Sequence, residues 1–484
     1  MKRTLTLTCA TLIGGFGGPL TGTALAGNTN YLASSTAVSV GPISNAQLAS
    51  SGRFNPSASM VSTERARFPV LDFTINLQQR GLGEFNTVFE DMDDQINQIS
   101  DTFDAYDAGN ASVGDVLGEV DALEASLDRN VELLADNFYI KPGALVNLPM
   151  TPLNLNLGTA GTFSFGASSL TQARGSLLHG PIEFDIDPQT ISDTSDDGED
   201  LDPIDYLRTT SSVYLKQGQV FNLDIGYAQA LPSIQFLDQF GIDATAGVRG
   251  TLIAHNLQKH LYPLKDLARQ ASDDDSTLSD DIANDVSEGF KDFNFDVALD
   301  AGVTFEWNNT LVGVTAYNLN APLLEYNRLG RDCASISNET AQTECYHAEY
   351  FASIGDIDLN EEHRMFPHLT VDASQSFLNN RLAVAGAVDL WQKSDLFGEE
   401  SQNVNLAFLA QPSSWYWPRL RLGVGKDLLD FEATQLGLGL SFFDVVQFDT
   451  HINSVLGDLF SSNATEQGNA LRSASAALSL NVAF

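Results

Sequence analysis

Residues Phe293–Trp307 read FNFDVALDAGVTFEW, and this stretch decides how the rest of the chain is interpreted. Every odd-numbered position in it is apolar, whereas Asp296, Asp300 and Glu306 occupy even-numbered positions. A period of two predicts a β-strand with one apolar and one polar face. The apolar row is long enough for a tilted strand to cross a bilayer, and it has aromatic residues at both ends. Both features are typical of a transmembrane barrel strand whose polar face lines an aqueous lumen.

The same period recurs along the chain. It predicts strands at 68–78, 162–170, 182–186, 220–230, 245–256, 293–307, 311–320, 367–377, 382–391, 404–410, 419–424, 434–442, 446–455 and 473–484. From Thr245 onward, short connections alternate with long ones, as in barrels with short periplasmic turns and longer extracellular loops. We therefore predict an all-β fold, a transmembrane antiparallel barrel of roughly 14 strands. Arg419 and Arg421 join the three carboxylates above on its lumen-facing side.

Composition limits the classes of partner. The chain has 484 residues, with 63 acidic and 25 basic side chains and a formal net charge of -38. Such a polyanion is a poor nucleic-acid partner, because phosphates are bound by Lys and Arg. No apolar run after the N-terminal region is long enough for a membrane helix. The expected surroundings are therefore outer-membrane lipid and water.

The first 26 residues predict an export signal. Lys2 and Arg3 precede an apolar stretch, and Ala24-Leu25-Ala26 forms a small-residue cleavage site. Export to an oxidising compartment favours a disulfide between Cys333 and Cys345, the two cysteines that remain. The alternative is a pair of unpaired thiols on an exposed loop.

The exported chain divides into a small-residue segment at 27–67 and the barrel at 68–484. Apolar residues at helical spacing predict a helical hairpin within 84–137, flanked by many carboxylates. We expect this insertion outside the cell, as a lid over the barrel mouth. Long extracellular loops are expected at 257–292 and 321–365. The acidic stretch 193–205 resembles the start of a calcium loop but lacks its final Glu, so a solvated loop is favoured over a metal site.

The layout resembles the conjugal-transfer TraF-like family of outer-membrane proteins and, more distantly, the FadL-type channels for hydrophobic compounds. The similarity is carried by the order of segments and by Phe54-Asn55-Pro56-Ser57-Ala58, in which Asn55 and Pro56 match an Asn-Pro-Ala element of the FadL hatch. Ser57 departs from that element. The terminal Phe484 resembles the signal read by the outer-membrane barrel assembly machinery. The resemblance implies an outer-membrane location in a Gram-negative bacterium and a hatch at residues 54–57.

Two functions from different classes follow. The first is passive transport of a small apolar solute through a plugged barrel. The alternative is a structural or surface-contact protein connected with conjugation or envelope assembly. Enzymatic activity is not expected, because His451 and Ser454 fall on opposite faces of one strand and His347 and His363 lie among loop carboxylates without a motif. No cofactor or metal is expected either.

Overall fold

The computed structural model describes residues 33, 35–45, 48, 51–60, 67–149, 151–197, 203–232, 235–272, 293–412, 414, 416–443, 445–455 and 470–483. The predicted signal peptide at 1–26 and the terminal Phe484 lie outside these residues. Much of the predicted long loop at 257–292 lies outside them as well.

Fourteen strands of the described chain form one closed antiparallel barrel. They are β1 (Arg67–Arg80), β2 (Tyr139–Asn147), β4 (Thr162–Leu178), β7 (Ser212–Ala230), β8 (Ile242–Pro263), β9 (Asn294–Trp307), β10 (Thr310–Tyr317), β13 (His368–Phe377), β14 (Leu382–Asp389), β17 (Asn403–Ala410), β18 (Arg419–Asp427), β19 (Thr434–Phe442), β20 (Val446–Ser454) and β21 (Leu471–Ala483). The ring closes because β1 pairs with both β2 and β21, and β2 also pairs with β4. The predicted fold class and strand number are confirmed.

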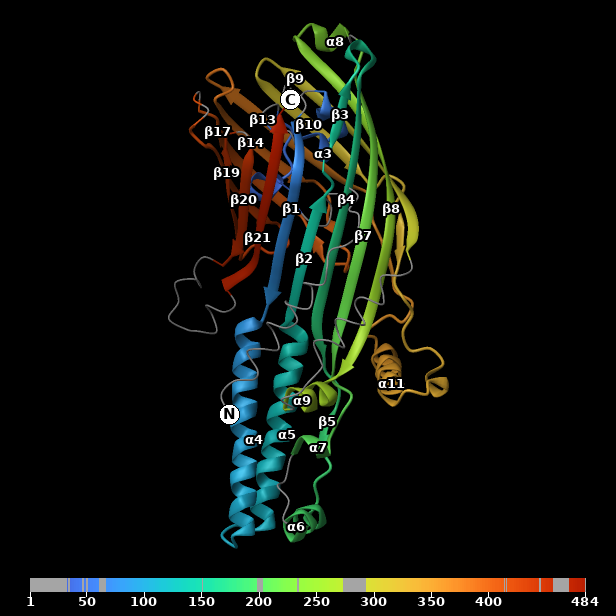
Figure 1. The fold of residues 1–484 in the computed structure, drawn as a ribbon, viewed down its shortest axis with the longest axis vertical. Coiled ribbons are helices and arrows are strands. Elements are labelled where there is room, and N and C mark those ends of the chain that lie inside the picture. The colour runs from blue at the N-terminus through green and yellow to red at the C-terminus, as the bar shows by residue number, and fades with distance from the viewer. Residues whose placement is uncertain are drawn as a thin grey trace.

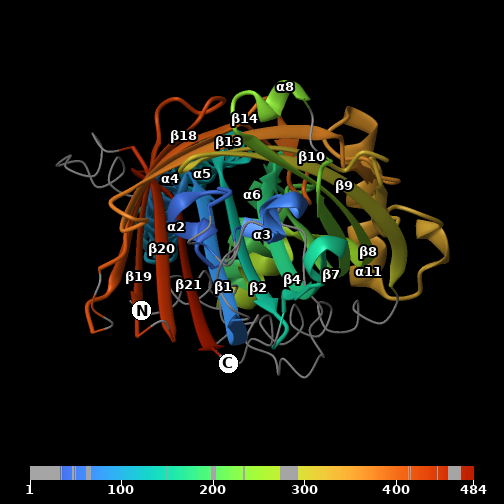
Figure 2. The same ribbon diagram turned by 90° about the horizontal axis from the view of Figure 1, so that it is seen from above.

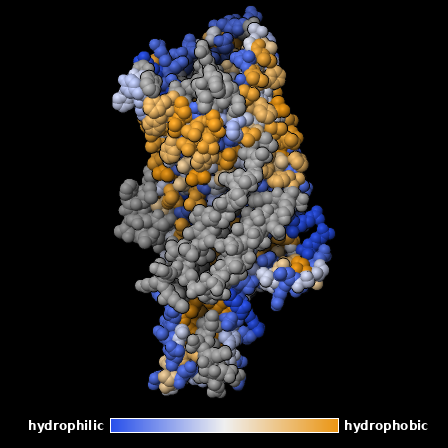
Figure 3. Space-filling model, viewed as in Figure 1, coloured by the Kyte–Doolittle hydropathy of each residue, from blue (hydrophilic) through white to orange (hydrophobic). Residues whose placement is uncertain are grey.

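Alternation along β9 separates a lipid-facing row from a lumen-facing row. On the lipid-facing row, Phe295 is 69% exposed and Leu299 is 46% exposed. Asp300, on the lumen-facing row, is 2% exposed. The same separation holds around the barrel, and Figure 3 shows an apolar belt on the visible face of the wall, with hydrophilic atoms above and below it. An apolar belt of this kind matches the hydrocarbon layer of a bilayer.

Short and long connections lie at opposite ends of the barrel (Figure 1). The β9–β10 turn is Asn308–Asn309, whereas the next connection runs from 318 to 367. The first residues of β1 and the last residues of β21 lie at the short-connection end, where Arg67 pairs with Ala483. The described chain therefore enters and leaves the barrel on the same side.

Sequence alternation missed β2 and underestimated β4. Lys141, Pro142 and Gly143 interrupt the apolar pattern of β2, so its local sequence does not favour a strand. Pairing with β1 on one side and β4 on the other imposes the strand. The predicted 182–186 strand is β5 (Ile182–Phe184), which lies outside the barrel and pairs with β6 (Leu207–Thr209).

The described chain has five further short strands and several helices. The strands are β3 (Leu153–Asn156), β11 (Leu323–Glu325), β12 (Glu362–Arg364), β15 (Lys393–Ser394) and β16 (Glu400–Ser401). The helices are α2 (Ala37–Val40), α3 (Ser51–Phe54), η2 (Pro56–Ser59), α4 (Leu82–Asp107), α5 (Val113–Asn137), η3 (Gly158–Ala160), α6 (Pro188–Asp197), α7 (Pro203–Tyr206), α8 (Gln235–Asp238), α9 (Leu264–Ser272), η4 (Cys333–Ser335) and α11 (Glu339–Ile354). None of the helices described is both long and apolar enough to cross a membrane.

Helices α4 and α5 form the predicted hairpin, but not a lid. They extend away from the long-connection end of the barrel as a column (Figure 1). Ser112 and Asp115 form a capping box that starts α5. The apolar faces pack on each other and on the 182–207 connection through two clusters: Ile99, Phe103, Val116, Val120, Leu123, Ile186 and Ile191, and Leu127, Val131, Leu134, Leu177, Ile182 and Leu207. The expected lid over the mouth is wrong, because this connection already covers the apolar stripes.

The stretch 193–205, expected to be a solvated loop, is partly helical. Helix α6 continues to Asp197, and α7 begins at Pro203. Among the residues that the structure describes, no group of three or more His, Cys, Asp or Glu side chains is placed to hold a metal ion.

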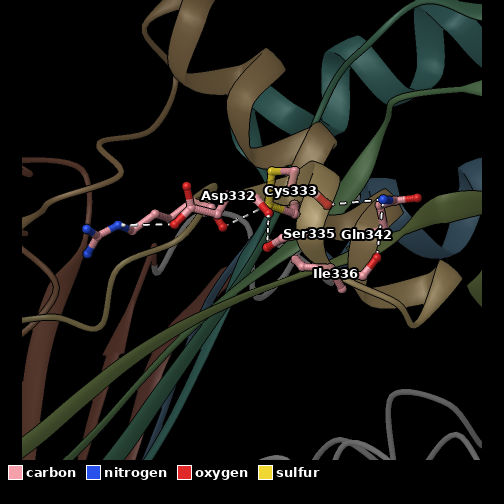
Figure 4. The surroundings of a disulfide bond; sticks show 7 residues. Asp332, Cys333, Ser335, Ile336 and Gln342 are labelled. Carbon is pink, nitrogen blue, oxygen red and sulfur yellow. Dashed lines mark hydrogen bonds and ion pairs between the residues drawn. A yellow bond between two sulfur atoms is a disulfide. The ribbon is translucent and has the colours of Figure 1, made fainter.

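The predicted disulfide between Cys333 and Cys345 is confirmed (Figure 4). It joins η4 to α11 within the 318–367 connection. Gln342 donates to the carbonyl oxygens of Cys333 and Ile336, at 3.1 and 3.3 Å. The apolar face of α11 packs through Ala348 and Phe351 on Tyr214 and Leu261 of the barrel rim. The disulfide therefore fixes a helix that covers part of the long-connection end.

Candidate functional site

The described part of residues 33–60, here called the N-terminal segment, lies inside the barrel. Figure 2 shows α2 and α3 within the ring of strands. Most of the described residues of the segment are buried. Its Val40, Ile43 and Leu48 pack on small inward-facing side chains of β14 and β17, among them Ala385 and Ala407. The segment thus makes an apolar contact with the wall, and it makes polar contacts as well.

The hatch-like motif of the sequence lies against β9 and β10. Asn55 caps η2 by accepting a hydrogen bond from the backbone N–H of Ser57, at 3.1 Å. Its amide also donates to the Thr304 hydroxyl, at 3.1 Å, and the Ser57 hydroxyl contacts the same Thr304 oxygen, at 2.6 Å. The Tyr317 hydroxyl donates to the Phe54 carbonyl, at 2.7 Å. Pro56 begins η2, where its missing N–H leaves no donor unsatisfied.

Three buried arginine–aspartate pairs surround the segment. Arg53 of the segment itself contacts Asp72 of β1, at 2.8 Å, and donates to the Thr151 carbonyl, at 2.9 Å. Arg249 of β8 makes two hydrogen bonds to one carboxylate oxygen of Asp300, at 2.9 and 2.7 Å, and a third to the Arg53 carbonyl. These contacts link the wall to the segment through charged hydrogen bonds, which are stronger than neutral ones.

The third pair lies on the opposite wall. Arg421 of β18 donates to both carboxylate oxygens of Asp449 on β20, each at 3.0 Å. Asp449 also accepts a hydrogen bond from the Ser39 hydroxyl. Asp372 of β13 accepts from the backbone N–H of Ser44, at 2.8 Å. Carboxylates from several strands therefore hold both ends of the N-terminal segment.

The other residues assigned to the lumen lie away from this contact. Asp296 accepts a hydrogen bond from the backbone N–H of Leu323, at 2.7 Å, nearer the long-connection end. Glu306 is exposed at the end of β9, and Arg419 is half-buried at the start of β18. The structure therefore brings Asp300 and Arg421 to the N-terminal segment and leaves Asp296, Glu306 and Arg419 elsewhere. Sequence reasoning missed their partners Arg249 and Asp449, which alternate onto the same inward rows.

Glycines in the wall make room for the segment. A Cβ atom on Gly437 of β19 would lie 2.8 Å from the Ser39 Cα and closer still to the Ser39 carbonyl. A Cβ on Gly247 of β8 would lie 2.6 Å from the Pro56 carbonyl carbon. Gly302 and Gly423 face the segment at similarly short range. The segment can lie against the wall only because these positions have no side chain.

A cavity of about 880 Å³, here called the vestibule, extends from the long-connection end to α2. Polar and charged side chains line it, among them Lys141, Asp389, His451 and Asn453, together with apolar ones such as Phe54 and Val424. Val38, Val40 and Gly41 of the N-terminal segment also line it. The lumen is therefore partly open from one end and ends at the segment.

The other half of the lumen is filled by two connections. Leu324, Tyr326 and Met365 of the 318–367 connection pack with Leu396 and Phe397 of the 390–402 connection against inward-facing side chains of β2, β4, β7, β8 and β9. Asp395 and Glu399, which flank the tip of the 390–402 connection, form ion pairs with Lys141 of β2, the first at 2.5 Å. The vestibule and this apolar half are separated by the 390–402 connection.

The barrel wall is interrupted beside the N-terminal segment. β2 pairs with β1 only up to Asn147, opposite Asp72. β3 continues along β4 from Leu153, but the described pairings of β3 do not include β1. Arg53 lies at this interruption, because it contacts Asp72 and the Thr151 carbonyl.

The family of the chain is given by its sequence. Residues 54–389 match the family model described as F plasmid transfer operon, TraF, protein. The chain belongs to this family. Its TraF-family match begins within the N-terminal segment and ends with β14, so it covers most of the barrel. No curated protein sequence matches the chain.

Solved structures similar to this TraF-family chain include two of TodX and one of a FadL homologue. The TodX deltaS2S3 mutant monoaromatic hydrocarbon channel is 10% identical, with a TM-score of 0.42, over 93% of this chain and 99% of that one. The Pseudomonas putida toluene transporter TodX is 10% identical, with a TM-score of 0.35, over 92% and 96%. A Pseudomonas aeruginosa FadL homologue is 11% identical, with a TM-score of 0.35, over 95% and 99%.

Proposed function

We propose that this TraF-family barrel passively transports a small apolar solute, and that the N-terminal segment is the hatch. The observation that carries the proposal is the vestibule, which reaches from the long-connection end to α2 and ends at the segment. Displacing the segment would lengthen the path without breaking a barrel strand. A scaffold with no transport role has no need for such a space.

The interruption between β1 and β3 supports the apolar character of the solute. It lies beside Arg53, at the inner face of the wall, and lipid-facing Leu155 and Phe163 are exposed on the neighbouring strands. A solute that leaves through the wall at this level meets hydrocarbon, which favours an apolar molecule. The charged vestibule alone would also admit water and small polar solutes.

The test compares the full exported chain with a variant that lacks residues 27–62. Purified protein is inserted in planar bilayers for conductance, and intact cells are assayed for uptake of an apolar fluorescent dye that the outer membrane excludes. We expect dye uptake by the full chain and a larger, steady conductance after the deletion. A folded deletion variant with neither conductance nor dye uptake would refute transport.

The alternative is a structural or surface-contact protein associated with conjugation or envelope assembly. The observation that favours it is the α4–α5 column, which projects from the barrel and carries almost only acidic charge. Replacing residues 84–137 by a short turn separates the two functions. If this variant lost cell contact or conjugal transfer while dye uptake was unchanged, the α4–α5 column would have the surface-contact role and the barrel would still transport.

The remaining parts of the proposal concern location. We place the barrel in the outer membrane of a Gram-negative bacterium, with the α4–α5 column outside the cell, and expect its assembly to require Phe484. An epitope inserted at 109–114 should be recognised by antibody on intact cells. Recognition only after permeabilisation would reverse the orientation. Catalysis, a cofactor and nucleic-acid binding form no part of the proposal.

A further inference from the structure

An apolar patch lies on the inner face of the barrel, where polar side chains are expected. Leu145 of β2 pairs directly with Leu170 of β4, which pairs with Val220 of β7. All three point into the lumen and are at most 3% exposed. The patch is completed by Ile253, Leu257 and Ala298. Five strands thus contribute to a largely apolar surface that water does not favour, although His255 lies between Ile253 and Leu257 on the same face.

The chain covers this apolar patch with its own side chains. Leu396 and Phe397, at the tip of the 390–402 connection, are 0% and 4% exposed and pack in the same cluster. The Tyr326 hydroxyl donates to the Leu396 carbonyl, at 2.6 Å. The tip is otherwise held by ion pairs of Asp395 and Glu399 with Lys141, and by a weaker contact of Arg174 with Glu399, at 3.3 Å. One isobutyl and one benzyl group of this connection therefore occupy the patch, beside Leu324, Tyr326 and Met365 of the 318–367 connection.

Several polar atoms in or beside the patch, His255 Nδ1 among them, lack a partner within the described residues, and three belong to Thr74, Ser168 and Asn222. Thr74 pairs with Leu145 across strands, and Ser168 and Asn222 pair with each other one step nearer the N-terminal segment. Their side chains are at most 1% exposed, and Thr74 Oγ1, Ser168 Oγ and Asn222 Oδ1 have no hydrogen-bond partner there. Because buried polar groups are nearly always hydrogen-bonded, these atoms point to a polar group that the chain does not supply.

The charges nearby disfavour an anionic partner. Asp72, Asp224 and Asp300 line the lumen on this side, against Arg53 and Arg249, whose guanidinium groups are already paired with Asp72 and Asp300. With all five ionised, the formal charge is -1. A carboxylate placed among these five groups would lose water without gaining a free cation. Lys141, four residues before Leu145 along β2, is shared by the two carboxylates of Asp395 and Glu399.

We propose that the apolar patch is a binding site for a small uncharged amphiphile with an apolar body and one hydroxyl group, such as a phenol or an alcohol. The body replaces Leu396 and Phe397 on the patch. The hydroxyl hydrogen-bonds with Thr74, Ser168 or Asn222. The 390–402 connection is then an internal competitor that the ion pairs of Lys141 keep in place. This inference rests on the proposed transport function and narrows its solute class.

The test uses three probes with the same apolar body: 1-naphthol, naphthalene and 1-naphthoate. Binding to the full exported chain in lipid nanodiscs is measured by probe fluorescence, and protein-free nanodiscs correct for partition into lipid. We expect 1-naphthol to bind roughly fivefold more tightly than naphthalene, the value of one neutral hydrogen bond. 1-Naphthoate should bind most weakly.

Two sets of variants separate the parts of the site. Leu396→Ala with Phe397→Ala should raise the affinity for 1-naphthol and naphthalene roughly tenfold, because the competing conformation is weakened. Lys141→Gln should act in the same direction without creating a cavity. Ser168→Ala with Asn222→Ala should reduce the preference for 1-naphthol over naphthalene, because two of the three hydrogen-bonding partners are removed. Heat-modifiable migration on gels verifies that each barrel is folded.

Matched controls lie outside the patch. Phe366→Ala removes an aromatic ring that is exposed on the 318–367 connection, and Ser353→Ala with Asn360→Ala removes the same polar groups at exposed sites. These controls should change neither affinity nor preference. Equal effects of the control and test variants would overturn the inference.

The proposed binding site and the proposed transport function can be refuted independently of each other. If the affinities and the preference are unchanged in every folded test variant while the dye is still taken up by cells, the site is wrong and transport stands. The proposed site would also be wrong if 1-naphthoate bound more tightly than both 1-naphthol and naphthalene. If the variants change binding as expected but no form of the chain, including the one that lacks residues 27–62, takes up a solute, the site stands and transport falls.

Discussion

The contact between Gly437 and α2 offers a sharp test of how the N-terminal segment is held. In Gly437→Ala, the new Cβ would lie 2.8 Å from the Ser39 Cα, whereas ordinary contacts are at least 3.4 Å. The Cα and carbonyl of Ser39 are backbone atoms, and the new Cβ is bonded directly to the backbone of β19. A side-chain rotation therefore cannot relieve the clash, and α2 must move away from β19.

The size of the effect follows from overpacking. Such clashes cost about 1–3 kcal/mol when the surroundings cannot yield. Here the barrel strands are held by pairing on both sides, so the cost falls on the seated state of the segment. The ratio of displaced to seated segment should rise by roughly fivefold to 150-fold, since 1.4 kcal/mol corresponds to a factor of ten.

Single-channel recording in planar bilayers measures this ratio as the frequency and duration of open events. Gly250→Ala is the matched control, because its Cβ would meet only Leu299 Cδ2, at 3.8 Å, on the lipid-facing side. We expect more open time for Gly437→Ala and none of this change for Gly250→Ala. A folded Gly437→Ala barrel that conducts like the unmodified protein would contradict the closure of the lumen by α2.

Three further predictions follow from the buried pairs, the disulfide and α11. Arg249→Met leaves Asp300 buried without its cation and should lower the free energy of unfolding by about 3–5 kcal/mol, seen as a lower temperature of gel-mobility change; an unaltered transition would contradict the pairing. Cys333→Ser with Cys345→Ser should weaken the loop locally by about 2–3 kcal/mol, so that protease cleaves it faster, while denatured, unreduced parent protein should label no thiol. Burial lowers the pKa of His347, although Asp266 opposes the shift, so the unfolded state binds more protons. The docking of α11 should therefore be fully stable above about pH 6.5 and weaken as the pH falls below it, measured by hydrogen exchange of α11, and His347→Gln should remove this dependence.

Local sequence patterns were sufficient to predict the class of fold. Period-two alternation depends only on neighbouring residues, so it identified most strands and assigned Asp300 and Arg421 to the lumen side. The lengths of the connections fixed which strand ends share a side of the barrel. The pairing of Cys333 with Cys345 was also predictable, because no other cysteine remains after the predicted signal is removed.

The contents of the barrel could not be predicted from such patterns, because they depend on contacts that form in the folded chain. The partners Arg249 and Asp449 depend on the register between strands, which alternation does not fix. β2 forms despite Lys141, Pro142 and Gly143 because its neighbours supply the hydrogen bonds. The α4–α5 column departs from a lid because the 182–207 connection covers its apolar faces. Such contacts join residues far apart in the chain, and local patterns carry no information about them.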